Sequence, residues 1–381
     1  FLLMVAIISY INLISTNMKI MHIAEPFATG VLSFLIDITK RQVEMNDIYI
    51  LYGIRPLTPE NVEELFDKRI HLIKINSFNG AINTVLSPKA YCEVYRWYKN
   101  IKPDIVHFHS SASGFIGRWL LPCNKIPTFY TPHGYSFLMR DGSKMKRFIF
   151  WLIEYLSAQR PTTTIACSEG EYLEAMKLSK NSTYVNNGID ICELESFVRE
   201  ICEIQKPIRV CTSGRILYQK NPRLFNEIAR LLPEINFIWI GEGELKTELT
   251  SPNITITGWI KREEALRIIR NVDFFILPSL WEGLPISLLE AMYLRKICLV
   301  SDVIGNRDVI KNGVNGLICN LASEYADAIK KIVSGQIDGK KMSNVASYDI
   351  VKNYNIDLMA QKYSEIYEDK RKEKNNYIKQ I

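Results

Sequence analysis

The sequence lacks the spacings by which cysteines staple small domains together or bind zinc. Its eight cysteines include no Cys-x-x-Cys pair and no framework typical of secreted disulfide domains. The chain also has no Gly-x-Gly-x-x-Gly after its first apolar run, and no stripe of lysine and arginine dense enough for nucleic acid. These absences argue against a disulfide scaffold, a zinc site, a dinucleotide oxidoreductase and a nucleic-acid partner, and favour reduced cysteines in a cytoplasmic protein.

Long apolar runs are scarce as well. Residues 1–17 are apolar, but they carry no positively charged start and no small-residue cleavage site, and they are short for a membrane span of about 20 residues. We interpret them as an upstream extension in preference to a signal anchor, because the run that starts at Met18 has the pattern of a first strand.

What the chain does have is enough apolar sequence for two domains. Its 381 residues exceed the roughly 250–300 at which a single core stops growing, and 47% of them are hydrophobic against 23% charged. The net charge of +6 is modest for this length and implies only a mild preference for acidic surfaces.

Short apolar runs alternate with amphipathic stretches from residue 18 onward. This alternation is typical of parallel strands covered by helices on both faces. We predict two doubly wound α/β domains, at 18–195 and 205–352, with a last helix at about 355–381 that packs back onto the first domain. The predicted strands are 20–24, 47–51, 71–74, 105–108, 128–131 and 163–166 in the first domain, and 209–213, 236–240, 255–258, 273–277, 297–301 and 316–319 in the second.

The strongest local pattern is EGLPISLLE at residues 282–290, which follows a predicted strand and opens a helix at Pro285. In an open α/β sheet, ligands bind outside the carboxyl ends of the strands. Main-chain N–H groups at a helix start attract an anionic group, and the Glu290 carboxylate can accept hydrogen bonds from two neighbouring hydroxyls, as a ribose presents them. Glu282 and Glu290 can therefore reach different parts of one ligand over this helix start.

This segment resembles the E-x7-E motif of the retaining glycosyltransferases of family 4. Further matches lie upstream in the order that the family shows: SGR at 213–215 with KNP at 220–222, IGEG at 240–243 and TGWI at 257–260. The resemblance spans about the whole chain from Met18. It implies the GT-B fold, in which two facing Rossmann-like domains enclose a deep cleft, and an activity that transfers a sugar from a nucleotide-sugar.

The resemblance also implies roles for the matching residues of the second domain. Glu290 would bind the ribose, and Glu282 would contact hydroxyls of the transferred sugar as a catalytic residue. Two cations and a helix N-terminus can stabilise a leaving diphosphate without a metal, so no cofactor is expected. The other donor contacts would be Arg215, Lys220, Gly243, Trp259, Ile260, Gly283, Leu284, Pro285 and Ile286.

The first domain carries fewer explicit signals. His133, in a Thr-Pro-His-Gly segment, resembles the family histidine that faces the donor sugar, and we predict that it is catalytic. Gly30 stands where the family often has a pair of glycines near the diphosphate. His109 and Ser168 are candidate cleft or acceptor contacts, although Ser168 can equally cap a helix, and His107 is expected to point into the sheet.

Residues 139–160 combine basic and aromatic side chains. Such a stretch suits docking on the anionic inner face of a membrane, and an amphipathic core helix with a solvated face is an equal alternative. By resemblance, we expect a hexosyltransferase that moves a hexose or N-acetylhexosamine from a UDP-sugar to an undecaprenyl-diphosphate-linked glycan in bacterial O-antigen or capsule synthesis. Two alternatives stay open: a sugar-nucleotide 2-epimerase of the same fold, and an inactive donor-binding subunit.

Overall fold

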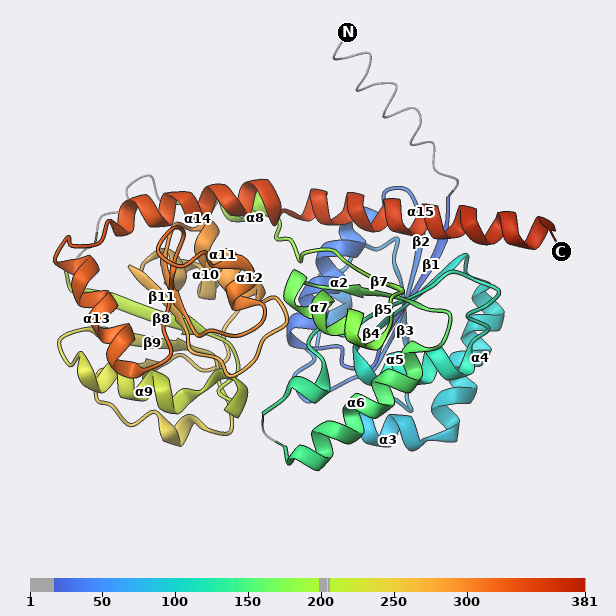
Figure 1. Cartoon of the computed structure of the whole chain (residues 1–381), viewed down its shortest axis with the longest axis horizontal. Coiled ribbons are helices and arrows are strands. Elements are labelled where there is room, and N and C mark those ends of the chain that lie inside the picture. The colour runs from blue at the N-terminus through green and yellow to red at the C-terminus, as the bar shows by residue number, and fades with distance from the viewer. Residues whose placement is uncertain (1–16, 141, 199–203, 205, 381) are drawn as a thin grey trace, which may run out of the picture.

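The structure is a computed structural model that describes residues 17–140, 142–198, 204 and 206–380. Two α/β domains lie side by side, and the last two helices run along one edge of both (Figure 1). The predicted extension at the N-terminus falls almost wholly outside the described residues. Among those described, no helix combines the length and the apolar content needed to cross a membrane, and the seven cysteines are all free.

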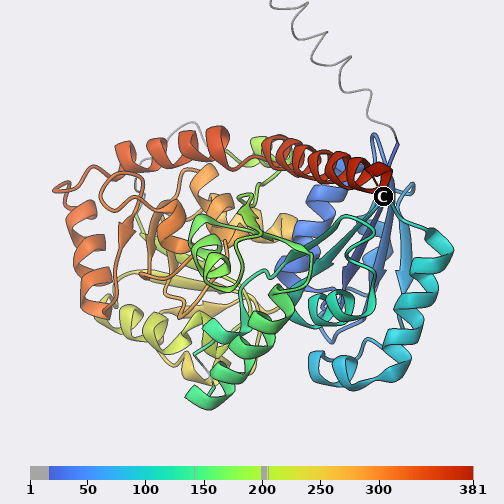
Figure 2. The ribbon, with the colours of Figure 1, turned by 45° about the vertical axis from the view of Figure 1, so that its right-hand side comes forward.

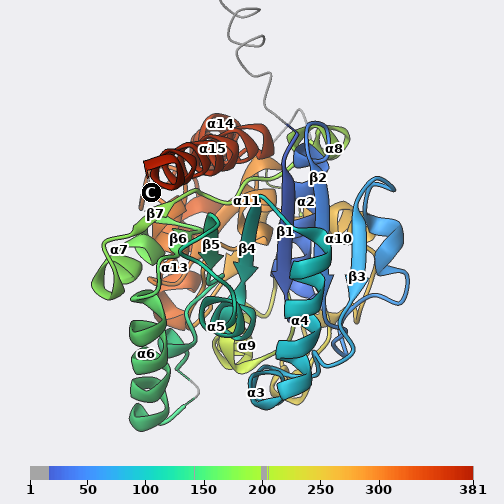
Figure 3. The same cartoon turned by 90° about the vertical axis from the view of Figure 1, so that its right-hand side faces the viewer.

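The N-terminal domain is built on a seven-stranded parallel sheet in the order β3-β2-β1-β4-β5-β6-β7. Figure 3 shows this sheet with helices on both faces. Six strands were predicted, and β7 was not. Its elements are β1 (Lys19–Ala24), α2 (Thr29–Gln42), β2 (Asp47–Tyr52), β3 (His71–Lys74), α3 (Ala81–Leu86), α4 (Pro88–Ile101), β4 (Ile105–His109), α5 (Ser110–Leu120), β5 (Thr128–Thr131), α6 (Lys144–Ala158), β6 (Thr163–Ala166), α7 (Glu169–Leu178), β7 (Ser182–Tyr184) and α8 (Ile191–Leu194).

The C-terminal domain repeats the plan with a six-stranded parallel sheet in the order β10-β9-β8-β11-β12-β13. The predicted strand at 255–258 is displaced: β10 ends at Ile256, because Gly258 turns the chain with a φ of +71°. The elements are β8 (Arg209–Ser213), α9 (Pro222–Leu231), β9 (Asn236–Ile240), β10 (Ile254–Ile256), α10 (Arg262–Arg270), β11 (Phe274–Leu277), α11 (Ile286–Tyr293), β12 (Ile297–Val300), α12 (Asn306–Val309), β13 (Leu317–Ile318), α13 (Ala322–Val333), α14 (Gly339–Asn353) and α15 (Ile356–Gln380).

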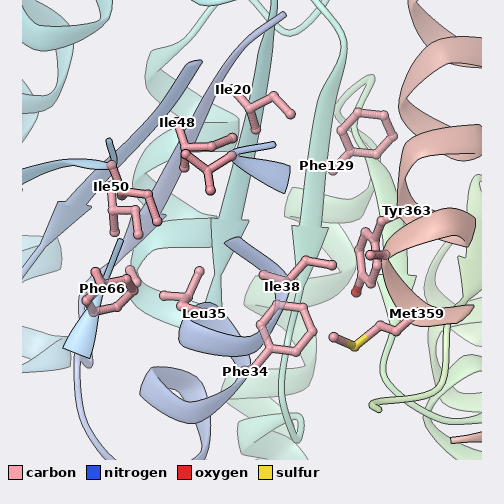
Figure 4. Packing of buried hydrophobic residues seen from close by; sticks show 14 of the residues in the cluster. Ile20, Phe34, Leu35, Ile38, Ile48, Ile50, Phe66, Phe129, Met359 and Tyr363 are labelled. Carbon is pink, nitrogen blue, oxygen red and sulfur yellow. The ribbon is translucent and has the colours of Figure 1, made fainter. Parts of the chain in front are cut away.

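The last helix, α15, returns from the second domain and completes the core of the first. Met359 and Tyr363 are buried there and pack with Phe34 and Ile38 of α2, as the labelled side chains of Figure 4 show. The views of Figures 1 and 2 both place α15 along the same edge of the N-terminal domain. The core of this domain therefore contains residues from both ends of the chain.

We predict that Met359→Ala lowers the free energy of unfolding by about 2–5 kcal/mol, the usual cost of truncating a buried methionine to alanine. Met359 is 2% exposed, and its sulfur also accepts a hydrogen bond from the main-chain N–H of Gly188 at 3.2 Å. Chemical denaturation measures the effect, and Lys362→Ala, exposed on the same helix, is the control. Equal stability of the two variants would contradict this account of α15.

Candidate active site

The loops that follow β5 and β11 meet at the carboxyl ends of the two sheets. A side-chain Cβ placed on Gly283 would lie only 3.2 Å from the main-chain nitrogen of Gly134 and 3.4 Å from the carbonyl carbon of His133. Nearby, the buried Asn187 amide donates a hydrogen bond to the Leu284 carbonyl at 3.1 Å. The structure thus brings the predicted histidine of the first domain and the predicted helix start of the second into one site.

Glu282 forms an ion pair with Lys220. Its Oε1 lies 2.6 Å from Lys220 Nζ, and the side chains are only 7% and 16% exposed. The amide of Gln219 donates to the Trp281 carbonyl at 2.9 Å and lies 3.4 Å from Glu282 Oε2. Two of the predicted site residues therefore hold each other in place.

The start of α11 presents main-chain donors beside this ion pair. Among the described residues, the N–H groups of Gly283, Leu284 and Ile286 find no hydrogen-bond acceptor. The Leu284 side chain is buried, so that residue can offer only its main chain to a ligand. Pro285 precedes the helix in an extended conformation, as predicted for a helix start. The geometry is that of an anion-binding helix N-terminus.

Close main-chain packing explains the glycine at position 243. A Cβ on Gly243 would lie 2.3 Å from the Ile216 carbonyl oxygen, and one on Gly241 would lie at the same distance from the Gly214 oxygen. The donor contact predicted for Gly243 stays a prediction. Arg215 lies in the loop after β8, between Gly214 and Ile216; it is 34% exposed and pairs with Glu244 at 2.7 Å.

The two residues predicted to read the base differ in exposure. The Trp259 side chain is 56% exposed, so it does not pack in the core and is free to contact a ligand. Ile260 is half-buried against the core of the second domain. On the other side of the site, Gly30 in the first turn of α2 is exposed, and a Cβ added there would have no other atom within 4 Å.

Glu290 is buried and paired with Arg262, a residue that sequence reasoning missed. Arg262 Nη2 lies 2.6 Å from Glu290 Oε1, and Arg262 Nη1 lies 3.3 Å from Glu193 of α8. Burial raises the pKa of Glu290, and the Arg262 charge opposes that rise. The second carboxylate oxygen has no hydrogen-bond partner among the described residues, so it stays available for the predicted ribose.

A cluster of charges links this point to the first domain. Lys40 of α2 pairs with Asp190 at 2.8 Å and with Glu193 at 2.5 Å. Burial raises the pKa of Asp37, also in α2, to about 7; Arg262 opposes the rise, and Glu290 and Glu193 add to it. Nothing in the local sequence pattern pointed to these residues, since the cluster joins segments distant in the chain.

The histidine predictions need one correction. His133 is half-buried and its Nε2 lies 3.0 Å from Nδ1 of His109. His109 and Ser168 are fully buried, so neither side chain lines the cleft as an acceptor contact. Ser168 instead caps α7 by accepting a hydrogen bond from the Glu171 N–H at 3.2 Å, and His107 points into the sheet as expected.

One histidine cluster has the spacing of a metal site. Ring nitrogens of His22, His107 and His109 lie within 4.8 Å of one another. Each of the six ring nitrogens already has a hydrogen-bond partner at 2.6–3.0 Å. A metal ion at these nitrogens would have to replace those hydrogen bonds.

Family models match both halves of the chain. Residues 28–192 match Glycosyltransferase Family 4, and residues 197–349 match Glycosyl transferases group 1. The chain belongs to the family 4 glycosyltransferases. This confirms the resemblance drawn from the motifs, and makes the protein an enzyme that transfers a sugar.

Relatives with known names agree with this membership. The glycosyltransferase is 29% identical to the Escherichia coli UDP-Gal:alpha-D-GlcNAc-diphosphoundecaprenol alpha-1,3-galactosyltransferase, over 76% of this chain and 81% of the other. It is 24% identical to the Campylobacter jejuni N,N'-diacetylbacillosaminyl-diphospho-undecaprenol alpha-1,3-N-acetylgalactosaminyltransferase, over 81% and 88%.

Solved structures share the fold. Anabaena HepE in complex with UDP and glucose superposes with a TM-score of 0.74 at 16% identity, over 92% of this glycosyltransferase and 99% of that chain. Sucrose-phosphate synthase from Thermosynechococcus elongatus gives 0.77 at 14% identity, over 93% and 99%. The predicted architecture of two facing Rossmann-like domains is confirmed.

The raised pKa of Asp37 predicts a pH-dependent stability. The folded state holds this proton more tightly than the unfolded state, where the pKa is near 4. The free energy of unfolding of the wild type therefore falls as pH rises from about 4 to about 7. A variant without this carboxyl should not show that fall. Asp37→Asn should be more stable than the wild type by about 1–4 kcal/mol near pH 8, and equal to it near pH 4.

Thermal unfolding across this pH range measures the difference, with Asp327→Asn on an exposed face of α13 as the control. A constant offset between Asp37→Asn and the wild type at every pH would show that Asp37 does not titrate as the structure implies.

Proposed function

We propose that this glycosyltransferase moves a hexose or N-acetylhexosamine from a UDP-sugar to an undecaprenyl-diphosphate-linked glycan, with retention of configuration, in bacterial surface polysaccharide synthesis. The observation that carries the proposal is the convergence of Lys220, Glu282 and the free N–H groups of α11 opposite His133. The names of the Escherichia coli and Campylobacter jejuni relatives support this class of donor and acceptor.

The leaving diphosphate requires positive charge, and the chain can supply it from its own residues. Lys220, Arg215 and the N-terminus of α11 would stabilise the charge that develops on the phosphate oxygen. This set can work without a metal ion. Glu290 would hold the ribose, and Glu282 would orient hydroxyls of the sugar while keeping Lys220 in reach of the phosphate.

Retention fits the side chains near the transferred sugar. The acceptor hydroxyl would attack from the face that the diphosphate leaves, and a leaving phosphate oxygen would take the hydroxyl proton. Glu282 is already engaged with Lys220 at 2.6 Å, which makes it a poor nucleophile for a double displacement. Enclosure between the two domains would limit hydrolysis of the donor by water.

Helix α6 carries the proposal for the membrane face. Near its C-terminal end, the helix is attached to the rest of the domain by buried Glu154. This carboxylate pairs with Arg118 of α5 at 2.8 Å and accepts a hydrogen bond from the Tyr130 hydroxyl at 2.9 Å. The outward face of the helix is apolar, with Met145 67% and Phe148 55% exposed, and further exposed residues at Ile149, Leu152, Ile153 and Leu156.

Basic side chains lie among these apolar ones. Lys144, Lys146 and Arg147 are exposed on the same helix, and Lys144, Arg147 and Phe148 line a hollow with Phe137 and Trp151. A helix buried in a core would not expose this much apolar surface. Apolar side chains with lysine and arginine beside them suit the interface of an anionic bilayer, so we propose that the enzyme docks there from the cytoplasmic side, where a lipid-linked acceptor would be presented.

The donor site is tested by UDP binding. We predict that UDP stabilises the protein in a thermal-shift assay, and that Glu290→Gln weakens calorimetric UDP affinity about tenfold or more, because a charged acceptor to the ribose is lost. Glu263→Gln, at an exposed pair with Arg267 in α10, should bind UDP as the wild type does. Binding of GDP but not UDP would replace the proposed donor.

Activity then separates the three candidate functions. Labelled UDP-galactose and UDP-N-acetylgalactosamine are offered with and without undecaprenyl-diphosphate-N-acetylglucosamine. Sugar transfer to the lipid supports the proposal, and a change in the donor without acceptor would indicate the 2-epimerase. Binding with no turnover of any tested pair would favour the inactive subunit.

The membrane face is tested by co-sedimentation with vesicles. We predict binding to vesicles that contain phosphatidylglycerol, and little binding to phosphatidylcholine alone, because the basic residues contribute about 1 kcal/mol each at an anionic surface. Phe148→Ser should weaken binding about tenfold, since it removes a large inserted side chain. Ile82→Ser, 66% exposed on α3, is the matched control. Equal loss in both variants would overturn the role of α6.

A further inference from the structure

The turn between β6 and α7 of the first domain contacts both loops of the candidate site. One loop carries His133 and Gly134, and the other carries Gly283. The fully buried side chain of Glu171 reaches the first loop, and the main chain of Gly170 reaches across to the second domain. Two neighbouring residues of one helix turn thus touch both halves of the site.

Glu171 holds the first loop with one carboxylate oxygen and the end of β6 with the other. Its Oε1 accepts the hydrogen bond of the Gly134 N–H at 2.6 Å, and its Oε2 accepts that of the Cys167 N–H at 2.8 Å. Burial raises the pKa of Glu171, and these two N–H donors oppose the rise. Both oxygens are therefore in use, and a side chain with one acceptor oxygen could not replace them.

The bond to Gly134 stabilises an uncommon main-chain conformation. His133 has a φ of +53° and Gly134 a φ of +96°, both in the left-handed region. A residue with a side chain adopts this region at a cost in free energy, and it stays there where the surrounding groups hold it. The Glu171 carboxylate holds the turn, and it thereby sets the direction in which the His133 side chain leaves the main chain.

A single oxygen of Asp308 joins the two domains. Its Oδ2 accepts hydrogen bonds from the Gly170 N–H of α7 at 3.0 Å and from the Gly305 N–H at the start of α12 at 3.1 Å. Figure 1 labels α7 and α12 where the two domains meet. The main chain of Gly305 in turn packs on Gly283, because a Cβ on Gly305 would overlap the Gly283 carbonyl oxygen. Asp308 thus ties the Gly283 loop to the same helix turn.

We infer that the start of α7 sets the two halves of the active site against each other, with Glu171 as the positioning residue for the His133 loop and Asp308 as that for the Gly283 loop. Each residue acts through the main chain that it holds. The inference rests on the proposed function in one respect, since the two loops are proposed to enclose one UDP-sugar.

Binding of the nucleotide should not depend on these two residues. Lys220, Arg215 and Glu290 all belong to the second domain. UDP would therefore still bind when the two loops move apart. The losses would fall on the alignment of the loops across the sugar and on the exclusion of water between them. A misplacement of about 1 Å at a reacting centre can lower the rate about a hundredfold.

Matched amide substitutions give opposite expectations for the two carboxylates. Glu171→Gln has one acceptor oxygen for two N–H groups, so amide hydrogen exchange at Gly134 or Cys167 should rise about tenfold, the value of one hydrogen bond. Asp308→Asn keeps an oxygen that can accept from both of its donors, so the exchange of its partners should stay near the wild-type rate. Glu169→Gln, exposed in the same helix turn, is the control. Wild-type exchange in Glu171→Gln would overturn the inference.

Gly170→Ala tests the contact between the domains without weakening α7. Alanine favours a helix more than glycine does, so the first domain should fold at least as well. A Cβ at this position would lie 2.8 Å from both carboxylate oxygens of Asp308 and must displace them. We expect Gly170→Ala and Asp308→Ala to share one defect, and the double variant to be no worse than either. Additive losses in the double variant would contradict the contact.

The fate of the donor sugar tests the positioning role. Labelled UDP-galactose or UDP-N-acetylgalactosamine is supplied with undecaprenyl-diphosphate-N-acetylglucosamine, and both the transferred and the free sugar are measured. Glu171→Gln and Asp308→Ala should lower kcat about tenfold to a hundredfold, and lower the ratio of transfer to hydrolysis, with calorimetric UDP affinity unchanged. A loss of folded protein alone would lower both products equally and leave the ratio as it was.

The outcomes separate this inference from the proposed function. If calorimetry detects no UDP-sugar binding, the proposed donor is wrong, and exchange at Gly134 and Gly170 still decides whether α7 holds the two loops. If exchange rises while kcat and the ratio of products stay at their wild-type values, the two carboxylates only stabilise the fold; the positioning role is then wrong and the proposed function stands.

Discussion

The site depends on the close approach of two main chains, one from each domain. Gly134 follows a strand of the first sheet, Gly283 precedes a helix of the second, and almost no room for a side chain is left between them. Parallel sheets collect their loops at one edge, and here two such edges face each other. Without a side chain at this contact, His133 and the free N–H groups of α11 can act on a single small ligand.

Charged residues of the site are held in pairs. Lys220 is paired with Glu282, Glu290 with Arg262, and Arg215 with Glu244. A buried charge without a partner is costly, so Lys220 and Arg262 stabilise the buried carboxylates of Glu282 and Glu290. A diphosphate can pair with Lys220 and Arg215, while a ribose can bind the second carboxylate oxygen of Glu290 and leave the first on Arg262. Arg262 also reaches Glu193 near the join between the domains.

The sequence predicted what depends on local pattern. Eleven of the twelve expected strands lie close to their predicted places, because buried parallel strands read as short apolar runs. The edge strand β7 was missed because its three residues are polar or aromatic and half-exposed. The motif at 282–290 located the helix start, since its spacing is local.

What the sequence could not predict are contacts between distant segments. Gln42 and Tyr367 look like ordinary core positions until the fold places Gln42 against His22 and Tyr367 against His107. Ser168 and His109 were candidate cleft contacts, and only the fold shows that both side chains are buried, Ser168 as the cap of α7 and His109 at the end of β4. The pairing of Arg262 with Glu290 likewise joins two helices whose separation along the chain carries no periodic signal.

The return of α15 to the first domain sets an order of events during biosynthesis. Tyr363 and Tyr367 complete the core around Phe34 and Phe129, yet they leave the ribosome after the whole second domain. The first half of the nascent chain therefore waits with an incomplete core while the second half folds. A polypeptide that terminates before α15 lacks the side chains that complete this core and the Tyr367 hydroxyl that bonds to His107.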